Sequence, residues 1–185
     1  MKAFLRDAGA TIILAAVIFL GLQTTVDSIV VDGPSMQPNF YTGQRLLVNK
    51  AIYKFSDPQR GDVIILRSPN GDNNDFIKRI IGLPGETVEI ISEKVSIRTK
   101  DGEVFPLDEP YITKQSPKAF RSDKIPDNEY FVLGDNRNNS DDSRSGWTVP
   151  REDIVGKAWL SVWPPDMWGL AANYPLQKQV DSLTQ

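Results

Sequence analysis

The N-terminal segment and the rest of the chain differ in their pattern of hydrophobic and polar positions. Residues 8–26 contain no charged side chain, and most of this run reads AGATIILAAVIFLGL. As a helix the run would extend about 28 Å, close to the roughly 30 Å hydrocarbon core of a bilayer. The pattern therefore predicts a transmembrane signal-anchor helix over residues 8–26.

The charges that flank this run predict its orientation. Lys2 and Arg6 precede it, whereas Asp27 and Asp32 follow it, and positive charge is enriched on the cytoplasmic side of membrane spans. Residues 1–7 are expected in the cytoplasm and residues 27–185 outside it, at the cell membrane or at a thylakoid membrane in an organism that has one. A cleaved signal peptide and a buried core helix are the alternatives, but QTTVDS after the run is a poor cleavage site.

After residue 26, short runs rich in β-branched and aromatic residues recur between turn signals. These runs are RLLVNK, GDVIILR, DFIKRIIG, ETVEII, KVSIRT, EYFVLGD and IVGKAWLSVW, and the segments SPNGDNND and LPGE have the composition of turns. The pattern predicts a mainly β domain over residues 27–185. The more polar stretch 92–128 is a candidate subdomain or flap on that domain.

Two residue types are missing from the chain, and this limits its chemistry. Without cysteine there are no disulfides, thiolate nucleophiles or thiolate metal sites, and without histidine there is no Ser-His-Asp triad or histidine-rich zinc site. Any acid-base chemistry must then use Lys, Asp, Glu or Tyr. The formal net charge of -3 offers no basic surface for nucleic acid.

The segment GPSMQP places Ser35 between Pro34 and Pro38. Proline fixes the backbone, and Gly33 permits a conformation or a close approach that a side chain would block. The segment is therefore stiff enough to hold a hydroxyl in one direction. On these residues alone an ordinary turn with a solvent-facing serine is the favoured interpretation, because a nucleophilic Ser35 needs a base.

Lys78 is the leading candidate for that base in a chain without histidine. It lies in the run DFIKRIIG, where alternate strand residues face opposite sides, so Lys78 and Arg79 cannot both face a buried site. Burial among Phe76, Ile77 and Ile80 would lower the pKa of the lysine from its usual value and leave a usable fraction of neutral amine. The alternative is a pair of exposed charges that protect a strand edge.

The polar segment GDNRNNSDDSRSG is predicted to be a loop, since it is rich in Asn, Asp and Ser. Its aspartates, together with Arg137 and Arg144, predict a network of ion pairs and hydrogen bonds within the loop. Calcium is the alternative, but the acidic residues do not follow the spacing of an EF-hand, so no metal site is expected. A hydroxyl such as that of Ser140 or Ser143 is suited to orient a neutral lysine.

Four segments, in this order after an apolar N-terminal run, closely resemble the sequence boxes of bacterial type I signal peptidases, a serine protease family with a Ser-Lys dyad. The segments are GPSMQP, RGDVI, DFIKRIIGLPGE and GDNRNNSDDSR, and the resemblance runs from about residue 10 to about residue 160. It implies a signal-peptidase/LexA-like β-ribbon catalytic domain with one N-terminal transmembrane helix. It also implies a membrane-bound serine endopeptidase that removes signal peptides from translocated preproteins after small residues of the Ala-x-Ala type, through an acyl-enzyme.

Carried over position by position, the resemblance implies roles for individual residues. Ser35 would be the nucleophile, with its backbone N–H as one oxyanion donor, and Lys78 would be the general base. Ser140 would orient the lysine, and Asp142 and Arg144 would form a supporting pair. The other supporting residues, at the start of the same box, are Gly134 and Asp135.

Gly33 departs from the pattern of part of the family. Some members carry a hydroxyl residue two positions before the nucleophile, where it supplies a second oxyanion donor, and this chain has glycine there. Other members also have glycine, so activity is still expected. Water and another main-chain N–H are the two options for the second donor.

The resemblance further implies that the preprotein lies as an extended strand between residues 31–33 and residues 75–77, held by main-chain hydrogen bonds. Apolar pockets would then admit only small side chains. The expected substrate-binding residues are Val31, Gly33, Met36, Phe40, Leu46, Phe76 and Ile77. The expected partners are signal-peptide-bearing preproteins and the lipid bilayer, with no nucleic acid, no cofactor and no metal.

Tryptophans gather near the C-terminus in AWLSVWPPDMWGL. We expect Trp159 in the core, whereas packing and contact with lipid headgroups are equally open for Trp163 and Trp168.

Two other functions compete with the peptidase interpretation. A membrane-anchored β module that binds a partner without chemistry fits the same composition. A self-cleaving repressor shares the dyad and much of the fold, but it needs an N-terminal pair of DNA-binding helices, where this chain has an apolar run. The repressor is therefore a poor fit.

Overall fold

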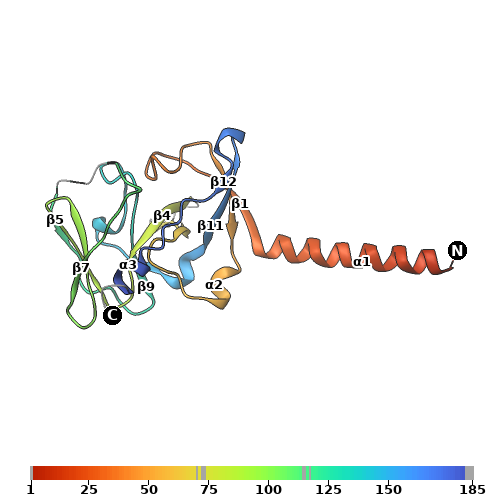
Figure 1. Cartoon of the computed structure of the whole chain (residues 1–185), viewed down its shortest axis with the longest axis horizontal. Helices are drawn as coiled ribbons and strands as arrows, with labels where there is room; N and C mark the ends of the chain where they lie inside the picture. The colour runs from red at the N-terminus through yellow and green to blue at the C-terminus, as the bar shows by residue number, and fades with distance from the viewer. Residues whose placement is uncertain (1, 70, 72–73, 114–115, 117, 182–185) are drawn as a thin grey trace.

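A long helix, α1 (Lys2–Thr25), stands away from a β domain formed by the rest of the described chain (Figure 1). The computed structural model describes residues 2–69, 71, 74–113, 116 and 118–181. The helix contains almost the whole apolar run that the sequence predicts to be helical over residues 8–26. Within the described part of the chain, however, no helix is both long enough and apolar enough to cross a bilayer. The membrane-spanning role of residues 8–26 therefore stays a prediction.

The main sheet has eight strands within the described residues, and every pairing in it is antiparallel. Its order is β1 (Val26–Val30), β2 (Arg45–Asn49), β11 (Ile154–Trp163), β3 (Val63–Arg67), β4 (Asp75–Gly82), β9 (Glu129–Leu133) and β10 (Val149–Pro150), with β12 (Gly169–Leu170) paired to β11. Burial alternates along β2 but is continuous over most of β3 and β4. Strands buried on both faces read as continuous apolar runs, which is how GDVIILR reads in the sequence, whereas DFIKRIIG is interrupted by Lys78 and Arg79, both of them buried. The predicted mainly β class is confirmed.

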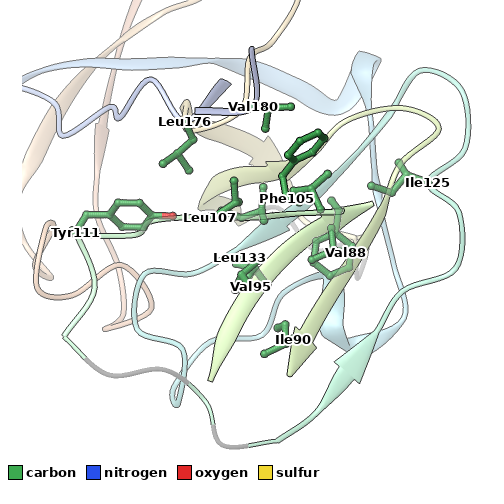
Figure 2. Close-up of a cluster of buried hydrophobic side chains, with 13 residues drawn as sticks. Val88, Ile90, Val95, Phe105, Leu107, Tyr111, Ile125, Leu133, Leu176 and Val180 are labelled. Atoms are coloured by element: carbon green, nitrogen blue, oxygen red, sulfur yellow. The ribbon is translucent and has the colours of Figure 1, made fainter. Parts of the chain in front are cut away.

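A second, smaller sheet has the order β7 (Val104–Pro106), β6 (Lys94–Arg98), β5 (Thr87–Ile91) and β8 (Phe120–Arg121). Its apolar face packs on the C-terminal segment that contains α3 (Gln177–Asp181). Val180 of α3 and Leu176, the residue before α3, lie over Val88, Val95 and Phe105 (Figure 2). Three of its four strands come from the stretch 92–128, while β5 precedes that stretch. The identity of residues 92–128 as a separate subdomain or flap stays a prediction.

Short helical segments connect the strands. They are α2 (Ile52–Phe55) and the 3-10 turns η1 (Ser143–Ser145), η2 (Arg151–Asp153) and η3 (Pro165–Met167).

Strand β11 exposes Trp159, so the expectation of a core position for this residue was wrong. The side chain is 48% exposed, because Ala158 takes the buried face of the strand and a register shift against β2 falls between Ala158 and Leu160. Trp163 and Trp168 are also exposed. The indole N–H of Trp168 donates to the carbonyl of Val162 at 2.6 Å.

Gly61, in the segment RGDVI, joins the main sheet to the C-terminal segment. Its N–H donates to the carbonyl of Ile80 at 2.8 Å, and its carbonyl accepts from the N–H of Tyr174 at 3.2 Å. The residue has a φ of +93°, and an ideal Cβ built on it would lie 1.6 Å from the carbonyl oxygen of Tyr174. Both the backbone conformation and the close approach of two chain segments therefore require glycine.

We expect Gly61→Ala to lower the free energy of unfolding by about 2–5 kcal/mol, because it adds a backbone clash to a left-handed conformation. Gly102→Ala is the matched control, since Gly102 has a φ of +88° but nothing within 4 Å of its ideal Cβ. Only the conformational cost of about 1–2 kcal/mol is expected there. Urea-induced unfolding measures both variants, and equal losses would contradict the close-approach argument.

Candidate active site

The loop after β1 holds Ser35 next to residues that are anchored in the core. Met36 and Phe40 are fully buried, and backbone hydrogen bonds from Gln37 to Pro34 and from Phe40 to Met36, 3.1 and 3.0 Å long, close the turns between them. Ser35 itself is half-buried. The buried side chains of Met36 and Phe40 therefore anchor the loop in the core, while Ser35 lines a cavity.

Lys78 lies on β4 directly beside that hydroxyl. Its Nζ donates to Oγ of Ser35 at 3.0 Å and to the carbonyl of Ile77 at 3.1 Å. The ring of Phe76 lies 4.9 Å from the same nitrogen. The lysine is only 4% exposed, since its amine lies against the Phe76 ring and the loop that carries Ser35.

The pKa of Lys78 is lowered from 10.5 to about 8 by burial. The carboxylates of Asp142, Asp141 and Asp135 oppose the shift, since negative charge favours the protonated amine. With such a pKa about one lysine in ten is neutral near pH 7, compared with about one in a thousand for an ordinary lysine.

The loop after β9 reaches the site through Gly134. An ideal Cβ on Gly134 would lie 2.2 Å from Oγ of Ser140 and 2.5 Å from the carbonyl oxygen of Ser35. Glycine at this position thus lets the two serines approach each other across the loop. The N–H of Gly134 donates to Oδ2 of Asp142 at 3.0 Å, and Asp142 also binds Arg144 through two hydrogen bonds of 2.7 and 2.8 Å.

The ion pairs around this loop differ in part from the prediction. Arg144 does pair with an aspartate of the loop, as predicted. Asp135, however, binds Arg79 of β4 through two hydrogen bonds of 2.8 and 2.7 Å, with both side chains fully buried. Arg137 pairs with Glu109, outside the loop. The prediction of a network within the loop was wrong for Asp135 and Arg137. The pairing of β4 with β9 brings Arg79 to Asp135, and the segment after β7 brings Glu109 to Arg137.

Asn39 and Asn136 are two further residues of the site that the sequence analysis did not single out. The side-chain amide of Asn39 donates to Oδ2 of Asp135 at 2.8 Å. The backbone N–H of Asn136 donates to the carbonyl of Ser35 at 2.9 Å, and its side-chain amide donates to the carbonyl of Pro34 at 3.1 Å. Both residues lie within quoted sequence boxes or directly after one, but only the fold shows what they contact.

A cavity of about 250 Å³ lies beside the Ser35–Lys78 pair, lined by residues 29–35, 75–78 and 139–141. Five of the other predicted site residues line it together with this pair, namely Val31, Gly33, Phe76, Ile77 and Ser140. Three predicted pocket residues do not line it and instead pack in the core near Val31 and Ile77, namely Met36, Phe40 and Leu46. The remaining predicted site residues do not line the cavity but stabilise the loop after β9 through their hydrogen bonds and ion pairs. They are Gly134, Asp135, Asp142 and Arg144.

Two strand edges flank the cavity. β4 pairs with β9 only from Arg79 onward, so within the described residues its segment 75–78 pairs on one side only, with β3. On the other side of the cavity, β1 pairs with β2 and with no further described strand. In the described chain the backbone N–H of Ser35 also donates to no protein acceptor. The site therefore offers backbone hydrogen-bonding groups to an extended peptide.

The sequence of the chain is similar to those of known signal peptidases. A family model described as signal peptidase, peptidase S26, matches residues 5–163. A signal peptidase I from Leptolyngbya laminosa is 40% identical over 173 residues, covering 89% of this chain and 83% of the relative. Signal peptidase I S from Bacillus subtilis is 38% identical over 175 residues, covering 88% of this chain and 91% of the relative.

Among solved structures, the crystal structure of a signal peptidase I from Enterococcus faecalis V583 is 34% identical and covers 55% of this chain and 97% of that chain, with a TM-score of 0.47. The sequence comparisons define the class of this chain, which is that of the peptidases, enzymes that hydrolyse peptide bonds. The chain belongs to the signal peptidase family, peptidase S26, and is a hydrolase of the signal peptidase I type.

The lowered pKa of Lys78 predicts how stability depends on pH. Between pH about 8 and pH 10.5 the folded lysine has lost its proton while the unfolded one still carries it, so the free energy of unfolding rises with pH. Across this window we expect the free energy of unfolding of the wild type to rise, relative to that of Lys78→Met, by at most about 3 kcal/mol. Urea unfolding of both proteins at several pH values measures the difference, and a difference that is independent of pH would contradict the shift.

Proposed function

We propose that this peptidase removes N-terminal signal peptides from preproteins, with Ser35 as the nucleophile and Lys78 as the general base. The observation that carries the proposal is the 3.0 Å contact between Nζ of Lys78 and Oγ of Ser35, in a place where burial lowers the pKa of the lysine to about 8. A general base must lie within hydrogen-bonding reach of the proton that it takes, and its pKa must be close to the working pH. Lys78 meets both requirements.

The reaction proceeds in two halves. The neutral amine of Lys78 takes the hydroxyl proton as Oγ of Ser35 attacks the scissile carbonyl carbon, and a tetrahedral intermediate forms. The protonated amine then gives its proton to the leaving amine of the mature protein, so the C–N bond breaks and an acyl-enzyme remains. In the second half Lys78 takes a proton from water as the water oxygen attacks the ester carbon. The second tetrahedral intermediate then breaks its bond to Oγ of Ser35, Lys78 returns the proton to that oxygen, and the signal peptide leaves as a carboxylic acid.

The developing negative charge on the scissile carbonyl oxygen needs hydrogen-bond donors. The backbone N–H of Ser35 is one donor, which is supported by its lack of a protein acceptor in the described chain. Ser140 lines the same cavity as Lys78, and we assign to it the role of orienting the amine. Two ion pairs stabilise the loop that carries Ser140, namely Asp142–Arg144 and Asp135–Arg79. Because Gly134 has no side chain, Ser140 can approach the backbone closely there.

The substrate binds as an extended strand between the edge of β1 with residues 31–33 and the edge of β4 at residues 75–77. Added strands take their affinity from main-chain hydrogen bonds and their specificity from pockets for alternate side chains. Val31 and Ile77 are buried at the cavity wall, which leaves shallow pockets suited to Ala-x-Ala sites. Met36, Phe40 and Leu46 support these walls from the core.

We also propose that the enzyme works at a membrane, with α1 in contact with lipid. Among the side chains of α1 that the structure describes, four large apolar ones are each at least 60% exposed, namely Ile12, Ile13, Leu14 and Val17. The exposed Trp163 and Trp168 are of a residue type that is enriched at membrane interfaces. Under this proposal residues 1–7 lie on the cytoplasmic side and the catalytic domain on the outer side, the orientation that the flanking charges favour.

We expect Ser35→Ala and Lys78→Met each to lower cleavage of a preprotein with an Ala-x-Ala site by a factor of at least about 1,000, because each removes one half of the dyad. Lys94→Met is the matched control, since Lys94 is exposed on β6 of the second sheet. Full-length enzyme in detergent is mixed with the preprotein, and mass spectrometry identifies the new N-terminus.

In the wild type and the control, kcat/KM should also fall about tenfold per pH unit below pH about 8, as Lys78 becomes protonated.

Full activity of either dyad variant would remove that residue from the mechanism. A wild type that binds the preprotein but cleaves none would favour the competing interpretation of a module that binds without chemistry.

For α1 we expect the full-length protein to float with liposomes in a density gradient. The double variant Ile13→Arg/Val17→Arg should largely lose this binding, because each charge in the apolar region costs about 2.5–3.5 kcal/mol. Ile91→Arg is the control, since Ile91 is an exposed isoleucine of β5. Equal flotation of all three proteins would show that α1 does not carry the interaction.

A further inference from the structure

Asn136 binds both peptide units that flank the Cα of Ser35. Its backbone N–H donates to the carbonyl of Ser35 at 2.9 Å, and its side-chain Nδ2 donates to the carbonyl of Pro34 at 3.1 Å. The Pro34 carbonyl only accepts hydrogen bonds, so the NH₂ end of the amide must face it. One residue of the loop after β9 thus fixes the backbone on each side of the nucleophile.

The Pro34 carbonyl and the Ser35 N–H belong to the same planar peptide unit and point in opposite directions. The carbonyl receives two donors, Nδ2 of Asn136 and the N–H of Gln37, both at 3.1 Å. These bonds set the orientation of the plane and hence the direction of the Ser35 N–H. They also polarise the peptide unit, which strengthens the N–H as a donor.

Asn136 is itself held in a rigid place. The preceding residue, Asp135, is fully buried in its ion pair with Arg79 and also accepts from Asn39, which comes from the loop of the nucleophile. The carbonyl of Asn136 accepts from the N–H of Asn139 at 3.0 Å. A residue whose backbone is fixed in this way presents its side chain from a fixed place to the peptide unit that it contacts.

We infer that Asn136 is a positioning residue of the oxyanion hole, acting through the Pro34–Ser35 peptide unit. It touches neither the scissile bond nor Lys78. The inference rests on the proposed function, since it assigns the Ser35 N–H to the transition state of peptide hydrolysis. An interaction that strengthens as charge develops on the carbonyl oxygen raises kcat and leaves KM unchanged.

The test compares two variants of the full-length enzyme, Asn136→Ala and Asn136→Asp. Both keep the backbone bond to Ser35, both lack the side-chain donor to Pro34, and Asn136→Asp also keeps the side-chain volume. At the pH plateau of each enzyme we expect kcat for a preprotein to fall about 3- to 10-fold with KM within twofold, the size expected for one hydrogen bond. The acid limb of the pH profile of Asn136→Ala should stay that of the wild type, because Lys78 is untouched.

A peptide aldehyde ending in alanine supplies the second readout. The aldehyde forms a hemiacetal with the serine hydroxyl, and the former carbonyl oxygen of the aldehyde then occupies the oxyanion position. Its Ki should rise by the same factor as kcat falls. Asn138→Ala is the matched control, because Asn138 is an exposed neighbour in the same loop, and both quantities should stay at wild-type values.

A merely structural role of Asn136 would lower the melting temperature and the folded fraction but leave the aldehyde Ki unchanged in the folded enzyme. That outcome would overturn the inference, as would folded variants with wild-type kcat. If Asn136→Ala does not fold, the near-isosteric Asn136→Asp decides on the same two readouts. Failure of the wild type to cleave would instead contradict the proposed function, so the two failures are distinguishable.

Discussion

The burial of the Lys78 amine beside the Ser35 hydroxyl is the interaction on which the rest of the site depends. The amine is buried, with the Phe76 ring and the loop that carries Ser35 packed against it. Asp142 and Asp135 lie near enough to favour its protonation. Each of these carboxylates is bound by an arginine, Arg144 or Arg79, and a paired carboxylate attracts a proton to the lysine less strongly than a free one. The arginines therefore act on the chemistry as well as on the loop.

Two loops that are about 100 residues apart in sequence meet over β4, and the site exists only where they meet. Asn39 reaches from the first loop to Asp135, and Asn136 reaches from the second loop to Pro34 and Ser35. Gly134 removes the side chain that would keep them apart. Since the contacts run in both directions, movement of one loop displaces the other, and the distance between Ser35 and Lys78 depends on both.

The sequence predicted the parts of this arrangement that follow from residue type and strand period. Without histidine, lysine was the leading base, and alternation along β4 separated Lys78 from Arg79, as the structure has them. The partners of Asp135 and Arg137 were not predictable, because Arg79 reaches Asp135 through the pairing of β4 with β9 and Glu109 reaches Arg137 from the segment after β7. Seven residues were assigned to substrate pockets, yet three of them, Met36, Phe40 and Leu46, lie in the core. Hydrophobicity indicates burial but does not distinguish the wall of a pocket from what lies behind it.

The one-sided strand edges at residues 75–78 and in β1 set a condition on what can be cut. A strand edge recognises a polypeptide only when several consecutive residues are extended and their own backbone groups are unpaired. A junction already folded into a helix or a sheet of the mature protein fails this condition, whatever its side chains are. Under the proposed function, cleavage would then have to precede the folding of the new N-terminus, so that recognition of the backbone fixes the order of events during secretion.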